Sequence, residues 1–346
     1  MTAPFDPDAA ARPGSGPFGL DDSAEDALLH ILPVPFDATT SYRDGAACGP
    51  EAILAASHQV ELSDLAFGEP HRAGIHWVPA DPRVAKWNTE ARRLAEPILA
   101  CGGMIDGDGE LERALARVNE LGERLNEHVA DHTARIMDAG KRPLILGGDH
   151  SVPFGAIRTA AERHPGLGLL HLDAHADLRV AYEGFRWSHA SILHNLLEDD
   201  AQLGNVVQVG LRDLGSREAQ RIERDPRLTA IFDHEWATAR LAGRDLRAIV
   251  RDSLAQLPAE VWITFDIDGL DPALCPNTGT PVPGGLGWNE AGLWLSELAA
   301  SGRTVVGADL VEVRPGEAPT GEDAWDAIVG ARLLYRLAAL VARSPS

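Results

Sequence analysis

The sequence predicts an α/β protein of three layers, α/β/α, in which helices cover both faces of a mostly parallel central sheet. Short apolar runs alternate along the chain with longer amphipathic segments, and this alternation of strand and helix is typical of parallel sheets covered by helices. Most of the apolar runs are continuous and do not alternate with polar residues. Such runs indicate strands that are buried on both faces.

Each predicted element follows from its local pattern. Continuous apolar runs predict strands over residues 28–34, 142–148, 167–174, 205–212, 228–234, 260–268 and 304–313. Apolar residues at three- and four-residue steps predict helices over 50–57, 109–139, 153–163, 189–198, 216–224, 240–256, 289–301 and 323–343. Residues 69–108 contain Trp77, Trp87 and several prolines without a clear strand, so we interpret them as an insertion beside the first strand.

Length and composition limit the organisation of the chain. With 346 residues and 45% hydrophobic composition, the chain can bury one large core, which we expect in a single catalytic domain over residues 25–346. The Pro-, Gly- and Ala-rich residues 1–24 are predicted to form a disordered tail. Cys48, Cys101 and Cys275 are too scattered to predict disulfides or a thiolate metal site.

The charge of the chain excludes some partners. A formal net charge of −21 argues against nucleic-acid binding, which requires a basic face. No apolar run approaches the roughly 20 residues that span a bilayer, and the acidic N-terminus lacks the regions of a signal peptide. We therefore expect a cytoplasmic protein with no membrane partner.

Ionisable residues stand at the carboxyl ends of three predicted strands. They occur in the segments "LILGGDHS", "LLHLDAHAD" and "WITFDIDGLDP". In a parallel sheet all carboxyl ends lie along one edge, which is where ligands bind in such folds. Alternate residues of a strand face the same side, so Asp266 and Asp268 can point together, as can Asp173 and His175. The residues concerned are Asp149, His150, Asp173, His175, Asp177, Asp266, Asp268 and Asp271.

Carboxylates and imidazoles gathered at one edge predict a metal centre. Without a cation between them, these groups would repel one another and lose hydration at a large cost. The number of ligands indicates two ions, and two ions about 3.5–4 Å apart generate hydroxide from a shared water near neutral pH. Oxygen-rich ligands with a minority of imidazoles favour Mn²⁺ over Zn²⁺, with Ni²⁺, Co²⁺ and Fe²⁺ as alternatives.

Simpler roles exist for some of these residues. Asp149, Asp271 and Asp177 are each compatible with a helix cap or a turn. His171 lies inside a predicted strand and is expected to be a hydrogen-bonded core residue. The segment "DIDGLDP" lacks the glutamate that a calcium loop places at its twelfth position.

Three motifs together resemble the ureohydrolase family of arginases, agmatinases and other guanidino-group hydrolases. They are "GGDHS" (147–151), "DAHAD" (173–177) and "FDIDGLDP" (265–272), in that order. The segments at 34–57, 278–286 and 308–315 extend the resemblance to roughly residues 28–340. It implies an arginase-like fold, hydrolysis of a small cationic guanidino substrate with release of urea, and a homotrimer or homohexamer.

The resemblance also implies roles for individual residues. One Mn²⁺ would be held by His150, Asp173, Asp177 and Asp266, and the other by Asp173, His175, Asp266 and Asp268. Glu312 would pair with the substrate guanidinium, with a strand-end salt bridge as the simpler alternative. Asp177 would hold the attacking hydroxide, and His189 would act as general acid, with a surface or helix-cap role as its alternative.

The loop between "DAHAD" and His189 departs from the family pattern. It reads "LRVAYEGFRW" and lacks the asparagine and serine by which arginases hold the amino and carboxylate groups of arginine. Arginine is therefore a doubtful substrate. The candidates for contacts with substrate at the pocket mouth are Arg179, Tyr182, Glu183, Arg186 and Trp187.

Several functions are compatible with these features. The favoured substrates are agmatine, for which Glu183 would pair with the distal ammonium, and a guanidino acid such as 4-guanidinobutyrate, for which Arg179 or Arg186 would bind the carboxylate. Bulky aromatic residues could instead shrink the pocket to fit guanidine or a small substituted guanidine. The family resemblance implies that an enzyme of this kind can use Ni²⁺. Alternatives of another class are a non-catalytic metal-binding partner subunit and a deacetylase-like amidohydrolase, whose single zinc and histidine pair the chain does not match.

Overall fold

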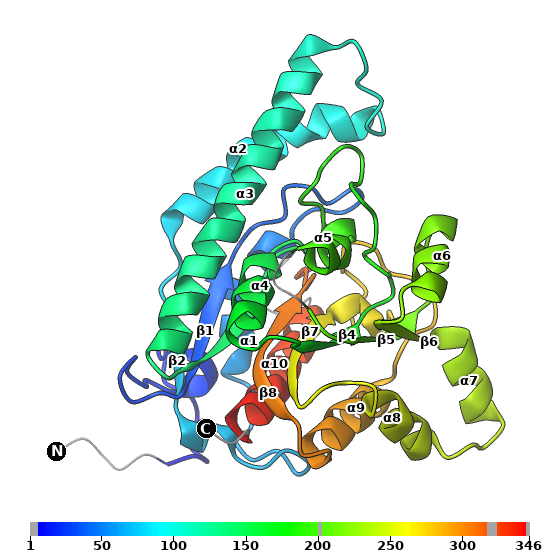
Figure 1. The fold of residues 1–346 in the computed structure, drawn as a ribbon. Coiled ribbons are helices and arrows are strands. Elements are labelled where there is room, and N and C mark those ends of the chain that lie inside the picture. Colours follow the sequence, from blue (N-terminus) through cyan, green and yellow to red (C-terminus); the bar gives the residue numbers. More distant parts are fainter. Residues whose placement is uncertain (1–5, 200–202, 317–323, 344–346) are drawn as a thin grey trace.

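The computed structural model describes residues 6–199, 203–316 and 324–343, and its centre is one parallel sheet (Figure 1). Eight strands follow the order β2-β1-β3-β8-β7-β4-β5-β6, and all of their pairings are parallel. The predicted parallel sheet is thus confirmed. The strands are β1 (Leu29–Val34), β2 (Ile75–Trp77), β3 (Arg142–Gly147), β4 (Gly168–Leu172), β5 (Val206–Leu211), β6 (Leu228–Phe232), β7 (Glu260–Asp266) and β8 (Thr304–Val311).

Helices cover both faces of this sheet, as the sequence predicted, and each face has its own apolar core. On one face lie α1 (Gly49–Ser57), α7 (Asp233–Leu241), α8 (Leu246–Leu254), α9 (Trp288–Ala300) and α10 (Trp325–Arg343). The other face is covered by α2 (Pro82–Ala100), α3 (Gly109–Asp138), α4 (Phe154–Arg163), α5 (Ile192–Glu198) and α6 (Ser216–Arg224). Because β3, β4, β7 and β8 are sandwiched between the two cores, their side chains are almost entirely buried.

The helix predicted over 240–256 corresponds to α8; only its first two residues belong to α7, a helix that was not predicted. Gly243 adopts a left-handed backbone with φ of 65°, a conformation that few other residues tolerate, and α7 ends just before it. The side chain of Asp245 then accepts a hydrogen bond from the amide of Ala248 (3.2 Å) and starts α8.

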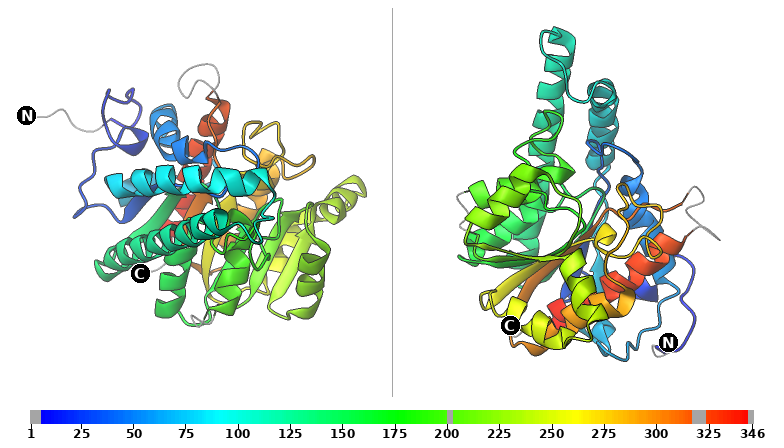
Figure 2. Two further views of the ribbon diagram at one scale, coloured as in Figure 1. Left: turned by 90° about the horizontal axis from the view of Figure 1, so that it is seen from above. Right: turned by 90° about the vertical axis from the view of Figure 1, so that its right-hand side faces the viewer.

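Residues 69–108, interpreted as an insertion, contribute two regular elements to the fold. The strand β2 pairs with β1 at the edge of the sheet, and its three residues are too few for a recognisable apolar pattern. The helix α2 begins after Asp81, which caps it, and packs along α3. Figure 2 shows the two helices side by side, with their connected ends projecting beyond the rest of the molecule.

Part of the predicted N-terminal tail is packed on the domain. Phe18 is buried, its ring centroid lies 4.7 Å from that of Tyr335, and its amide donates to Ser57 Oγ (2.9 Å). Disorder was therefore the wrong expectation for this stretch, while residues 1–5 lie outside the described part. Among the described helices, none has the combination of length and apolar character that a bilayer crossing needs.

Candidate metal centre and cleft

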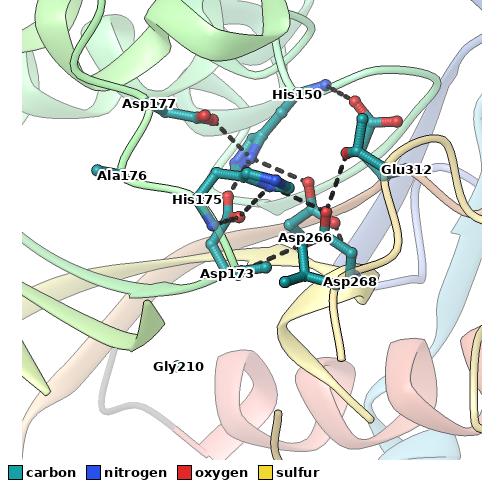
Figure 3. Close-up of polar contacts among 12 residues, drawn as sticks. His150, Asp173, His175, Ala176, Asp177, Gly210, Asp266, Asp268 and Glu312 are labelled. Atoms are coloured by element: carbon teal, nitrogen blue, oxygen red, sulfur yellow. Dashed lines mark hydrogen bonds and ion pairs between the residues drawn. The ribbon is translucent and has the colours of Figure 1, made fainter. Parts of the chain in front are cut away.

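The predicted ligands converge at the carboxyl ends of four adjacent strands, β3, β8, β7 and β4 (Figure 3). His150 follows β3 and Glu312 follows β8, while Asp266 ends β7 and Asp173 follows β4. The turn after β3 requires Gly148, because a side chain there would collide with the carbonyl of Phe36. Strand order and parallel direction thus bring together residues that are far apart in the sequence.

His150 lies at the centre of three carboxylates. Its Nδ1 is 2.9 Å from Asp173 Oδ2, 3.1 Å from Asp177 Oδ2 and 3.4 Å from Asp266 Oδ2. This nitrogen is fully buried and makes no hydrogen bond of acceptable geometry within the described structure. A buried polar atom without a hydrogen-bond partner is costly, so its position is best explained as that of a ligand nitrogen.

The other ring nitrogen of His150 is fixed by hydrogen bonds. Its Nε2 lies 2.9 Å from Thr264 Oγ1, and that hydroxyl is 2.8 Å from Asp309 Oδ1. The Thr264 hydroxyl donates to the Asp309 carboxylate and therefore accepts from Nε2–H of His150. This arrangement leaves the lone pair of Nδ1 directed at the three carboxylates, which is the tautomer that metal binding requires.

A second group lies beside the first and shares Asp173 with it. His175 Nδ1 is 3.1 Å from Asp268 Oδ2 and 3.5 Å from Asp173 Oδ1. The ligand atoms of Asp173, His175 and Asp268 all lie within 4.8 Å of one another, as do those of His150, His171, Asp173 and Asp177. A carboxylate shared by two groups suits a pair of metal ions.

The Asp173 carboxylate is oriented by His171, a residue that we expected in the core. Gln208 Nε2 donates to His171 Nδ1 (3.1 Å), so Nε2–H of His171 donates to Asp173 Oδ2 (2.9 Å). His171 is fully buried, which confirms it as a hydrogen-bonded core residue. Asp149 and Asp271 likewise accept backbone amides two residues ahead, from Ser151 (3.0 Å) and Ala273 (2.8 Å), as turn formers do.

The electrostatics of the cluster fit a bound cation. Burial, followed by the charges of Asp268 and Asp173, raises the pKa of Asp266 well above its usual range. Burial alone would lower the pKa of His150, but the three carboxylates outweigh it and hold that pKa well above its ordinary value. Without metal, the imidazole nitrogens and carboxylate oxygens of the cluster therefore hold protons, and a divalent cation would displace these protons on binding. His and Asp residues of this cluster could hold metal.

Glu312 lies beside these groups in a strained conformation. Its φ is 60°, in the left-handed region that non-glycine residues rarely adopt, and Asp177 shares this feature with a φ of 54°. The amide of His150 donates to Glu312 Oε1 (2.9 Å), while the amide of Glu312 donates to the carbonyl of Gly148 (2.7 Å). Burial, followed by the charge of Asp149, raises the pKa of Glu312 well above its usual range. Such strain is maintained where the surrounding structure fixes a functional side chain.

An open cleft of about 440 Å³ reaches the cluster, and His175 and Asp177 form part of its wall. Of the predicted loop residues, Arg179 and Tyr182 line this cleft, together with His189. The Arg179 guanidinium lies 4.7 Å from the centre of the Tyr182 ring, and its Nε is 3.6 Å from Glu218 Oε2. The charge of Arg179 is therefore already paired.

Three other loop residues lie away from the cleft lining. The Trp187 ring packs against Phe154 at a tilt of 54°, with ring centroids 4.9 Å apart, and lies closely over Gly122 of α3. The Arg186 guanidinium lies over Trp187, 4.6 Å from its ring centre. Glu183, with φ of 53°, has its backbone against Gly103 at the end of α2. Residues 183–187 thus pack against the α2–α3 pair, and for this reason their bulky side chains do not reach the cleft.

His189 lines the cleft, and its ring is neutral at neutral pH. It begins the short helix η4 (His189–Ser191), and its ring is 6.0 Å from that of Tyr182 in an edge-on arrangement. Burial, followed by the interactions with the nearby rings of His175 and His150, lowers its pKa to about 3. The neutral imidazole can accept a proton, and it must do so before it can act as the predicted general acid.

Sequence reasoning missed several residues that line the cleft. Asp213 follows β5 by two residues, so the same strand-end rule that marked the metal motifs could have identified it. Glu218 is buried and accepts amides from Leu178 (3.1 Å) and Gly215 (2.7 Å), which no local pattern signals. The remaining missed residues are Ser41, Tyr42, Arg43, Ala190, Thr280, Pro281 and Val282.

Comparisons with known proteins agree with this geometry. Residues 27–339 match the arginase family model. The chain belongs to the arginase family. It is 34% identical over 300 residues to the N(1)-aminopropylagmatine ureohydrolase of Thermus thermophilus, covering 86% of this chain and 87% of that protein. The guanidinobutyrase of Pseudomonas aeruginosa is 32% identical over 309 residues, covering 88% of this chain and 83% of the relative.

Solved structures show the same architecture. The agmatine ureohydrolase of Thermoplasma volcanium superposes with a TM-score of 0.67 at 23% identity, covering 93% of this chain and 92% of that one. This likeness confirms the arginase-like fold that the motifs implied. As an arginase-family member with relatives that are ureohydrolases, the protein is a hydrolase, and a silent partner subunit and a deacetylase-like enzyme are no longer needed as alternatives.

Proposed function

We propose that this arginase-family protein hydrolyses the guanidino group of a linear guanidino compound and releases urea and an amine. One observation carries the proposal. His175 and Asp177 belong both to the clustered ligands and to the wall of an open cleft, so a molecule bound in the cleft would meet the metal-binding groups directly. The relatives named for aminopropylagmatine and guanidinobutyrate hydrolysis support the same chemistry.

The proposed centre contains two divalent ions. His150, Asp173, Asp177 and Asp266 would hold one, and Asp173, His175, Asp266 and Asp268 the other, with Asp173 and Asp266 shared. Bound there, two ions would supply a hydroxide nucleophile near neutral pH. We propose Mn²⁺ because oxygen donors dominate the set, with Ni²⁺ as the alternative.

The chain itself would orient the reactants. Asp177, fixed by its left-handed backbone at the cleft wall, would accept a hydrogen bond from the attacking hydroxyl. We propose that the Glu312 carboxylate pairs with the substrate guanidinium, a charge-assisted contact that aligns its carbon for attack. His189, a neutral imidazole, would take up a proton and deliver it to the departing amine.

The tail of the substrate would be selected by two charges at the mouth of the cleft. Among the described residues, Asp213 forms no ion pair, so it is free to bind a distal ammonium such as that of agmatine. Arg43 lies 5.4 Å from the centre of the Tyr42 ring and donates to the carbonyl of Pro276 (3.1 Å), also without an ion pair in the described structure. A guanidino acid such as 4-guanidinobutyrate would use Arg43.

The first test is urea release from arginine, agmatine, 4-guanidinobutyrate, 3-guanidinopropionate and guanidine. The metal-free protein is reconstituted separately with Mn²⁺ and with Ni²⁺. We expect turnover of agmatine or a guanidino acid, and loss of that turnover in Asp173→Ala. No urea from any compound, with both metals bound, would contradict the proposal.

A matched pair of variants then identifies the tail. Asp213→Asn and Arg43→Gln each remove one charge at similar size. If the substrate is agmatine, Asp213→Asn raises KM and Arg43→Gln does not, whereas the reverse holds for 4-guanidinobutyrate. Equal effects on both substrates would show that neither residue recognises the tail.

Guanidine itself is a weaker candidate on structural grounds. Of the aromatic loop residues that could have narrowed the pocket, Phe185 is fully buried and Trp187 packs on Phe154, so of these three only Tyr182 lines the cleft. The cleft remains large enough for an extended substrate. The family resemblance further supports a cytoplasmic homotrimer or homohexamer, whose mass can be measured by light scattering.

A further inference from the structure

A second cluster of metal-binding side chains lies between α2 and α3, outside the cleft lining. It consists of Asp81, His128 and His132, whose ligand atoms all lie within 4.8 Å of one another. Asp81 caps the N-terminus of α2, and the two histidines lie four residues apart on α3. Histidines at this spacing share one face of a helix and form a chelating pair.

The two imidazoles are free to bind a ligand. The rings of His128 and His132 are 4.5 Å apart, and neither forms a hydrogen bond with the described residues. His128 is nevertheless 91% buried, beside the edge of Trp87. Its ring nitrogens are not among the fully enclosed polar atoms that lack a partner, so they remain open to water or to an ion.

The spacing of the cluster fits an ion better than a direct hydrogen bond. His128 Nδ1 is 3.9 Å from Asp81 Oδ2, which is too long for a hydrogen bond. Two ligands on a tetrahedral ion with bonds of about 2.0–2.2 Å lie roughly 3.4 Å apart. A small approach of the two side chains would therefore suffice to place a cation between them.

We propose that Asp81, His128 and His132 form a third metal site, which takes one divalent transition-metal ion such as Zn²⁺ independently of the binuclear centre. Two imidazoles and one carboxylate are ligands that Zn²⁺ accepts, with the fourth position left to water. The bound ion links the start of α2 to the middle of α3.

The site has a built-in competitor in Arg83. Its Nε and Nη2 lie 2.9 and 2.6 Å from Asp81 Oδ2, so Arg83 holds the carboxylate in the absence of metal. The Arg83 side chain is 63% exposed and can swing into solvent when an ion replaces it. Burial lowers the pKa of His128 and His132, which keeps both imidazoles neutral and available at neutral pH.

The test counts bound Zn²⁺ per chain for the full-length protein by equilibrium dialysis and elemental analysis. Wild type should bind one ion more than His132→Ala or His132→Gln, whatever the binuclear centre takes up. The control, His234→Ala on α7, should bind as wild type does. Loss of one of three ligands should weaken this ion by more than about 100-fold, because even an outer partner of a metal ligand contributes 10–100-fold.

Arg83→Ala separates the proposed site from a fortuitous histidine pair. Removal of the competing guanidinium should tighten the additional ion while leaving the other ions unaffected. Equal stoichiometry in wild type and both His132 variants would overturn the proposal. An additional ion whose affinity is the same in Arg83→Ala would also overturn it, since Asp81 would then not be a ligand.

Discussion

Asn88 on α2 and Asp37 after β1 form two reciprocal hydrogen bonds. The Asp37 amide donates to Asn88 Oδ1 (2.8 Å), and Asn88 Nδ2 donates to Asp37 Oδ1 (3.0 Å). The other carboxylate oxygen of Asp37 accepts the amides of Gly45 (2.7 Å) and Ala47 (3.0 Å). The segment between them carries Tyr42 and Arg43 to the cleft, so α2 holds one wall of the candidate active site.

Asn88→Ala should therefore impair substrate binding more than chemistry. Loss of two hydrogen bonds worth about 1 kcal/mol each loosens the cleft wall, which predicts a rise in KM of roughly five- to thirtyfold. The metal ligands lie on other strands, so kcat should change less. Steady-state urea release measures both constants, and the exposed neighbour Thr89→Ala is the control. An unchanged KM would show that this wall does not contact substrate.

Thr264→Val should weaken metal binding without touching a ligand. The Thr264 hydroxyl links His150 Nε2 to Asp309 and so fixes the ring tautomer. Without it, metal affinity should fall about 10–100-fold, as for other partners of metal-binding histidines. Titration of the metal-free protein with Mn²⁺ measures this affinity. Thr229→Val on β6 is the matched control, and equal affinities in the two variants would refute a role for the hydroxyl.

The sequence predicted the centre better than the cleft, for a physical reason. The metal motifs are short, lie at the ends of strongly apolar strands, and inherit their meeting point from the parallel topology. The cleft wall depends on contacts between distant segments, such as Asn88 with Asp37 and Trp187 with Gly122. No periodicity in either segment encodes such a contact, so Trp187 was expected at the cleft and α2 was overlooked.

The stability of the α6–β6 connection should depend on pH through Asp225. Its carboxylate accepts hydrogen bonds from Arg227 and Arg221, between 2.8 and 3.2 Å, and the Arg227 guanidinium in particular holds the pKa of Asp225 well below its usual range. Asp225→Asn should lower the free energy of unfolding by about 1.5–3 kcal/mol at pH 7, the range for hydrogen bonds to charged groups.

The sign of the pH effect follows from the lowered pKa of Asp225. The unfolded carboxyl takes up a proton near its ordinary pKa of about 3.9, whereas the folded one does so only at lower pH. The stabilisation is thus complete above about pH 4 and is lost as the pH falls through the folded pKa. Urea unfolding at pH 7 and at pH 3 measures it, with exposed Asp252→Asn as control. A difference between wild type and Asp225→Asn that grows on acidification would contradict this account.

Glu312→Gln distinguishes two roles for the Glu312 carboxylate. One oxygen accepts the amide of His150, and glutamine can keep that bond because it retains an acceptor oxygen. Glutamine cannot supply the charge that would pair with a guanidinium. If Glu312 recognises substrate, kcat/KM should fall by at least about 30-fold, since truncating a buried charge pair costs 2–5 kcal/mol. Metal content should stay the same as in wild type. If Glu312 only supports the backbone around His150, Glu312→Gln should retain activity and Glu312→Ala should lose metal. Urea release and metal analysis of the two variants together decide between substrate recognition and structural support.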